Sequence, residues 1–173
     1  METFLDILKF TIPGVIVFLT AYYSIKLFMK NEQQKRDYDF KNQGQKITTP
    51  IKVQAFERIV LFLERINPES LLVRTQANEM SAGQLHHDLL ITVRAEFEHN
   101  LSQQIYLSSQ SWMAVKQAKE ILIKIINQEA AKLTVHAPAS ALSEAILVQI
   151  MQMKDNPIQI AIDILKLEAS SFI

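Results

Sequence analysis

One apolar stretch near the start of the chain constrains its fold more than any other feature. Residues 10–25 (FTIPGVIVFLTAYYSI) are sixteen positions without a charge, and weaker apolar flanks extend the stretch to residues 7–29. A membrane-spanning helix needs roughly 20 mostly apolar residues, because the hydrocarbon core of a bilayer is about 30 Å thick. The stretch therefore predicts one N-terminal transmembrane helix that contacts the lipid bilayer through residues 7–29.

Two other interpretations of this stretch fit the sequence less well. A cleavable signal peptide begins with basic residues and ends at a small-residue cleavage site. This chain begins with Glu2 and Asp6 and has no such site. A buried helix of a soluble domain is the second alternative, and the basic residues that follow the stretch disfavour it.

Basic residues are distributed unequally around residues 10–25, and this predicts an orientation. Only Lys9 precedes them, whereas residues 26–46 hold six basic residues: Lys26, Lys30, Lys35, Arg36, Lys41 and Lys46. Loops on the cytoplasmic side of a membrane carry an excess of Lys and Arg. We therefore expect the N-terminus outside and the C-terminal domain in the cytoplasm.

The composition favours helices for the rest of the chain and excludes several classes of function. Three glycines in 173 residues are too few for a strand-rich or phosphate-loop fold. The absence of cysteine excludes disulfides, thiolate metal sites and cysteine nucleophiles. Eighteen basic residues balance eighteen acidic ones, which disfavours binding to a nucleic-acid backbone.

Local start signals divide the chain after the stretch into a stalk and about six helices. The polar residues from 31 onward continue the first helix to an end near Gly44. Later starts are marked by Thr49 with Pro50, Asn67 with Pro68, Ser81 with Gln84, Ser108 or Ser109, Ser140, and Asn156 with Pro157. The predicted fold is all-α: a transmembrane anchor (1–30), a polar juxtamembrane stalk and linker (31–48), and a helical cytoplasmic domain (49–173).

Apolar periodicity predicts which side of each helix is buried. In the helix at 49–66 the buried stripe is Val53, Phe56, Val60 and Leu63, widened by Ile59, Leu61, Phe62 and Ile66. In the helix at 81–107 it is Leu85, Leu89, Leu90, Val93, Phe97, Leu101 and Ile105. The last helix is apolar on nearly all sides, which predicts a central place in the core or a covering partner.

Two segments of the chain resemble a known family. They are residues 55–66 (AFERIVLFLERI) and residues 96–106 (EFEHNLSQQIY). With the apolar N-terminal stretch, they resemble an uncharacterised family of Bacteroidota in which a single-span anchor precedes a helical cytoplasmic body. The resemblance implies a bacterial inner-membrane location, and it implies no activity.

One pair of residues on a predicted helix is a candidate for metal binding. Glu96 and His99 have the Glu-x-x-His spacing that di-iron bundles use twice, but no second copy of this step exists. His86 and His87 are adjacent, so a helix directs them about 100° apart. We therefore assign no catalytic, cofactor-binding or metal-binding residue, and we expect no cofactor.

Charged residues suggest contacts with other proteins instead. Arg58 and Arg65 share a helix with Glu57 and Glu64, and we expect a ladder of surface ion pairs there. The alternative is a charged interface that orients a partner helix.

A second polar segment is denser than solubility requires. We take Arg94, Glu98, His99, Asn100 and Gln103 as a possible interaction face, with an ion pair between Arg94 and Glu98 four residues apart.

These features predict a membrane-tethered scaffold or accessory subunit without enzymatic activity, which binds a protein partner or itself. No small-molecule substrate is evident. One alternative is a small subunit of a transport or secretion complex that packs through its span. Another is a metal-dependent enzyme that uses Glu96 and His99.

Overall fold

The computed structural model describes residues 2–172, with the side chains of 2–12, 37 and 39–45 left out of that description. This part of the chain is helical throughout, apart from short connections. The helices are α1 (Glu2–Ile66), α2 (Pro68–Thr75), α3 (Ala82–Asn100), the 3-10 helix η1 (Leu101–Tyr106), α4 (Ser109–Ala130), α5 (Ala139–Gln152) and α6 (Pro157–Ala169). The predicted all-α class is confirmed.

The chain forms two compact units, Met1–Thr48 (unit 1) and Thr49–Ile173 (unit 2). Unit 2 starts at the residue where the sequence predicts the helical domain to start. The predicted helix end near Gly44 is wrong, because α1 is helical on both sides of Gly44 and through Pro50. A glycine or proline costs a helix about 1 or 3 kcal/mol without forbidding it. Thr49 consequently lies inside α1 and is not an N-cap.

Unit 1 consists of the first part of α1. In the part of the chain that the structure describes, no helix is both long and apolar enough to qualify as a candidate membrane span. Residues 7–12, which begin the predicted span, lie outside the described side chains.

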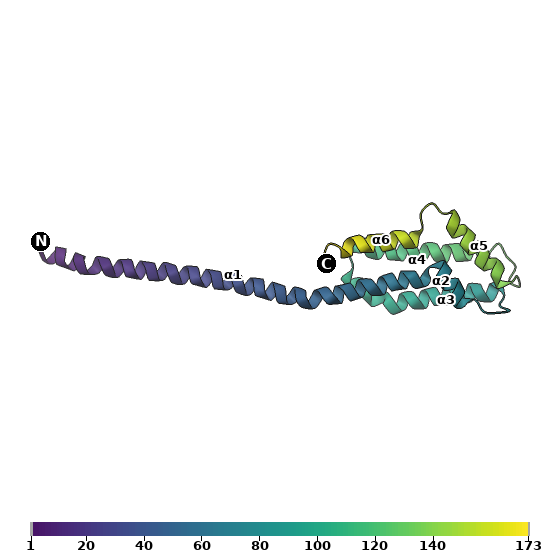
Figure 1. The fold of residues 1–173 in the computed structure, drawn as a ribbon, viewed down its shortest axis with the longest axis horizontal. Helices are drawn as coiled ribbons and strands as arrows, with labels where there is room; N and C mark the ends of the chain where they lie inside the picture. Colours follow the sequence, from purple (N-terminus) through teal and green to yellow (C-terminus); the bar gives the residue numbers. More distant parts are fainter. Residues whose placement is uncertain (1, 173) are drawn as a thin grey trace. The chain divides into compact units, whose positions relative to one another are not determined.

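Unit 2 has one hydrophobic core, to which residues 49–66 of α1 and helices α2 to α6 contribute. Within it α4 packs against α3, α5 and α6, and α2 packs against α3 and α5 (Figure 1). The rings of Phe62, Phe97 and Trp112 connect α1, α3 and α4, with centroids 5.8 and 5.5 Å apart. These contacts place the last turns of α1 directly over α3.

The predicted buried stripes are largely confirmed and fail where the backbone changes. Leu85, Leu89 and Val93 are fully buried in α3. Leu101 and Ile105 are exposed, because the chain passes from an α-helix to a 3-10 helix at Leu101 and the side chains no longer follow the α period.

Three of the six predicted helix starts are confirmed by cap hydrogen bonds, and α2 begins at Pro68 as predicted without a side-chain cap from Asn67. Ser81 forms the predicted capping box with Gln84, and the side chains of Ser108 and Asn156 cap α4 and α6. The cap at Ser140 is wrong, since α5 already begins at Ala139. The Ala139 amide donates to the Met80 carbonyl at 3.0 Å, so pairing with another segment sets this start.

Helix α6 is only half buried. Ile158, Ala161, Ile162 and Leu165 lie in the core, whereas Ile160 and Leu167 are 46% and 75% exposed. The predicted central position therefore applies to one side of the helix.

Candidate interaction face on helix α1

Five residues of α1 form an outward-facing surface, which we call the α1 face: Glu57, Arg58, Leu61, Glu64 and Arg65. Neighbouring positions are drawn into the core, where Phe56, Ile59, Phe62 and Leu63 are buried. With 3.6 residues per turn, residues spaced three and four apart on the opposite side must face outward. Leu61 lies at the centre of this face and is 57% exposed.

The sequence places Leu61 in the buried stripe, and this is wrong. The buried positions 55, 59, 62 and 66 follow the helical period closely, and position 61 lies well away from that line. The sequence did offer a signal for an exposed site: Leu61 is an apolar residue that lies outside the helical period of the buried positions and between two Glu-Arg pairs. Val53 and Val60, also in the predicted stripe, are only partly buried.

The predicted ladder of ion pairs along α1 is also wrong. Among the described residues, no ion pair joins Arg58 or Arg65 to Glu57 or Glu64. Arg65 turns toward α3 instead, where its Nη2 lies 2.7 Å and its Nε 2.8 Å from Oε1 of Glu96. The acidic side chains of the α1 face are thus left free to pair with charges on another molecule.

The Arg65–Glu96 pair is reinforced from α2. Nη2 of Arg74 lies 3.5 Å from Oε1 of Glu96 and donates to the Arg65 carbonyl oxygen at 3.2 Å. The Glu96 side chain is 16% exposed, so water screens this pair less than a surface pair. The contacts fix the end of α1 against α2 and α3 and thereby hold the α1 face in place.

A small polar pocket of about 210 Å³ lies on the α3 side of the α1 face. It is lined by Arg58, Leu61, Phe62, Arg65, Glu96, His99 and Asn100. Asn100 is 7% exposed, and its Nδ2 donates to the Glu96 carbonyl oxygen at 2.8 Å, which closes the end of α3. Two residues of the predicted interaction face, His99 and Asn100, therefore meet α1 here.

The other three residues of the predicted interaction face lie elsewhere. Arg94 and Glu98 are exposed, and the described contacts include no ion pair between them. A helix turns about 100° per residue, so they project from α3 on the side away from Asn100. Gln103 belongs to η1, where its Nε2 donates to Oγ of Ser102 at 3.2 Å.

An apolar groove of about 460 Å³ lies on the other side of the α1 face, between α1 and α6. Its apolar lining is Val53, Phe56, Val60, Leu61, Leu165 and Ala169, and its charged lining is Glu57, Glu64 and Lys166. Leu61 borders both the groove and the polar pocket. It therefore forms a ridge between two hollows, a shape that can receive another helix.

The candidate metal residues have other contacts. The Glu96 carboxylate already accepts from Arg65, and no group of three or more His, Asp or Glu residues suited to a metal occurs in the described part of the chain. His86 Nε2 lies 2.8 Å from Oδ1 of Asn127, and His87 is exposed.

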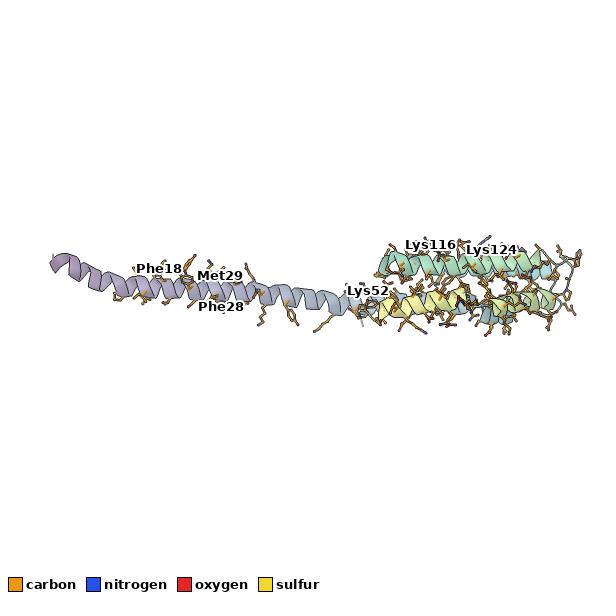
Figure 2. All side chains as sticks on the ribbon, turned by 90° about the horizontal axis from the view of Figure 1, so that it is seen from above. Phe18, Phe28, Met29, Lys52, Lys116 and Lys124 are labelled. Carbon is orange, nitrogen blue, oxygen red and sulfur yellow. The ribbon has the colours of Figure 1, made fainter. Side chains whose placement is uncertain are left out.

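Unit 1 carries a second exposed feature. Large apolar side chains from residue 15 to residue 29 are 46% to 68% exposed: Val15, Ile16, Val17, Phe18, Leu19, Tyr22, Tyr23, Ile25, Leu27, Phe28 and Met29. Phe18, Phe28 and Met29 project from the helix in Figure 2. Because residues 15–19 are consecutive, these side chains surround the helix instead of forming one stripe.

Comparison with known proteins identifies a family but no activity. The model of a family of unknown function (DUF7935) matches residues 2–172. No curated protein and no solved structure matches the chain. The expectation that the chain belongs to an uncharacterised family is confirmed. The match shows neither the bacterial group nor the single span.

Proposed function

The chain belongs to this family of unknown function, so the family does not indicate an activity. We propose that the protein is a membrane-tethered helical interaction subunit. Residues 7–29 act as the tether, and the α1 face of unit 2 binds protein. The proposal places the chain at the inner membrane of a bacterium, with its N-terminus outside and unit 2 in the cytoplasm.

The observation that carries the tether is the apolar surface around residues 15–29. An exposed apolar surface of this extent calls for an apolar environment, either lipid or another protein. One polar group within it is also satisfied locally, since the Thr20 hydroxyl donates to the carbonyl oxygens of Ile16 and Val17 at 3.0 and 2.9 Å. A hydroxyl bonded within its own helix suits a lipid-facing position, where no water is present to bond it.

The alternative function, a small subunit of a transport or secretion complex, would use the same residues to pack against other spans. Side-chain hydrogen bonds between spans would favour it. The Thr20 hydroxyl already donates within α1, which supports lipid contact over packing by that residue.

Extraction of membranes at alkaline pH tests the tether. We expect full-length protein to remain in the membrane pellet, and we expect Val17→Lys with Phe18→Lys to release it, because each central charge costs about 2.5–3.5 kcal/mol on insertion. The matched control is Ile47→Lys, also at an exposed position of α1, which should stay in the pellet. Release of the unsubstituted protein at alkaline pH would contradict the tether.

Capture from solubilised membranes tests the protein-binding face. Leu61→Asp should lose the proteins that co-purify with the full-length chain, because it puts a charge at the centre of the α1 face. Val148→Asp, at a similarly exposed apolar position on α5, should retain them. Identical sets of captured proteins from both variants, with a second, differently tagged copy of the chain counted among them, would contradict a role for this face.

A further inference from the structure

We propose that the α1 face binds a second copy of the same chain, with the two α1 helices antiparallel and related by a two-fold axis at Leu61. The proposal rests on the protein-binding role of the α1 face and names its partner. Glu57 of one copy then lies against Arg65 of the other, and Arg58 lies against Glu64.

The order of charges along the α1 face carries this proposal. Counted from Leu61, Glu57 and Arg58 stand four and three residues before it, and Glu64 and Arg65 stand three and four residues after it. In an antiparallel pair centred on one residue, each position meets the position equally far on the other side of that residue. Every charge on this face therefore meets its opposite, which gives four favourable contacts across the two-fold axis.

A parallel pair would not use this pattern. Two parallel helices in register bring equivalent residues together, so Glu57 would approach Glu57 and Arg58 would approach Arg58. Juxtaposed like charges disfavour association. The charge order thus selects one direction as well as one partner.

The charged groups are available for these contacts. Glu57, Arg58 and Glu64 are exposed and have no ion pair among the described residues. Arg65 is held by Glu96 but its side chain remains 47% exposed, and a guanidinium has five donors of which Glu96 engages those on Nε and Nη2. Glu96 thus leaves other donors of Arg65 available to the partner.

The apolar surface supplies the centre of the contact. Leu61 is a ridge beside the groove of about 460 Å³, and in the pair each Leu61 lies next to the groove of the other copy. Side chains of one helix that enter a groove on another give the usual geometry of helix packing. An apolar centre ringed by paired charges matches the usual arrangement of a protein interface.

Disulfide trapping of the full-length chain tests the proposal, because the chain contains no cysteine. Leu61→Cys places the thiol at the two-fold axis, where it meets its own copy. We expect a disulfide-linked dimer under mild oxidation in membranes. Val148→Cys, on α5 and 45% exposed, is the matched control and should remain monomeric.

Charge exchange then tests the direction of the helices. In the Leu61→Cys background, Arg58→Glu and Glu64→Arg should each reduce cross-linking about tenfold, since each homodimer gains two like-charge contacts. A mixture of the two variants should restore it, because the introduced glutamate of one chain then meets the introduced arginine of the other. Circular dichroism of each variant verifies that both are folded.

Two results would overturn the proposal: Leu61→Cys cross-linking no better than Val148→Cys, or a mixture that cross-links no better than its components. Failure of the dimer does not by itself contradict a binding role for the face. If no dimer forms but the Leu61→Asp chain no longer captures proteins that the unsubstituted chain captures, the face binds a different protein. Only the assignment of a second copy as its partner is then wrong.

Discussion

Arg65 pairs with an acid on another helix although Glu64 is its neighbour in the sequence of α1. The side chain contacts Glu96, which is 16% exposed, and Arg74 approaches the same oxygen. Replacing Arg65 and Glu96 by glutamine, singly and together, should give a coupling energy of about 1 kcal/mol in urea unfolding. Arg94 and Glu98 are the matched control pair, with no expected coupling. Equal couplings for the two pairs would contradict the assigned contacts.

Asn100 shows that a residue of the predicted interaction face has a structural role. Its side chain is buried and donates to the Glu96 carbonyl oxygen. Asn100→Ala should lower the free energy of unfolding by about 1–2 kcal/mol, because the Glu96 carbonyl oxygen loses the hydrogen bond from this buried side chain. His99→Ala, at the exposed neighbouring position, should change it by about 0.5 kcal/mol or less. Equal effects of the two substitutions would show that Asn100 does not hold the end of α3.

At the scale of helices, Glu168 joins the end of α6 to the start of α4. Its carboxylate accepts from the Ser108 amide at 2.9 Å and from the Ser108 hydroxyl at 2.7 Å. Partial burial raises the pKa of Glu168, but the hydroxyls of Ser111 and Ser108, the Ser108 amide and the charge of Lys52 together hold that pKa below its ordinary value. The ionised carboxylate is therefore the form that stabilises this junction.

This direction of the pKa shift sets a pH dependence. A carboxyl group with a lowered folded pKa contributes stability above its unfolded pKa, about 4.3, and loses it as the pH falls through the folded value. Glu168→Gln should therefore be less stable than the unsubstituted chain at pH 7, and the difference should shrink below about pH 4. Glu144→Gln, at an exposed position on α5, is the control. A difference that does not change with pH would contradict the role of the charge.

The start of α3 depends on a close approach by the segment before α5. The Gly83 amide donates to the Val135 carbonyl oxygen at 3.1 Å, and a Cβ at position 83 would lie 2.5 Å from Cγ1 of Val135. Gly83→Ala should cost about 1–2 kcal/mol of unfolding free energy, because Val135 must move. Gly14→Ala, where nothing lies within 4 Å, is the matched control and should not destabilise. If both are tolerated equally, the two segments are not in close contact.

Across the whole molecule, features set by neighbouring residues could be predicted from the sequence. Ser81, Ser108 and Asn156 cap helices through amides two or three residues away, so their role depends on a short segment alone. The buried stripe in α3 likewise follows from the helical period. The all-α class follows from the sum of such signals.

Features that depend on distant segments could not be predicted. Arg65 contacts a residue 31 positions away, and the start of α5 is fixed by Met80. Leu61 could be recognised as exposed only after the structure showed which side of α1 faces the core. The candidate site combines contacts of this kind, so the sequence indicated its four charged residues but not the exposure of Leu61 or the grouping of the five.

The two proposals together constrain the stalk. Antiparallel α1 segments point their N-terminal ends in opposite directions. Two chains tethered in one bilayer can therefore pair only when residues 31–48, which are helical in this structure, bend out of the α1 helix. Gly44 is the residue in this stretch that most readily permits a turn. Gly44→Ala should therefore weaken Leu61→Cys cross-linking in membranes and leave it unchanged in detergent, where the tethers are not held in one plane. Equal cross-linking in both media would show that no turn at Gly44 is needed.

Cysteine labelling tests the tethered orientation most directly, because the natural chain has no cysteine. Single-cysteine variants Glu2→Cys and Val148→Cys are treated with a membrane-impermeant maleimide in spheroplasts and again after permeabilisation. We expect position 2 to be labelled in intact spheroplasts and position 148 only after permeabilisation. Labelling of position 148 in intact spheroplasts, or protection of both positions until permeabilisation, would show that the chain is not tethered in this orientation.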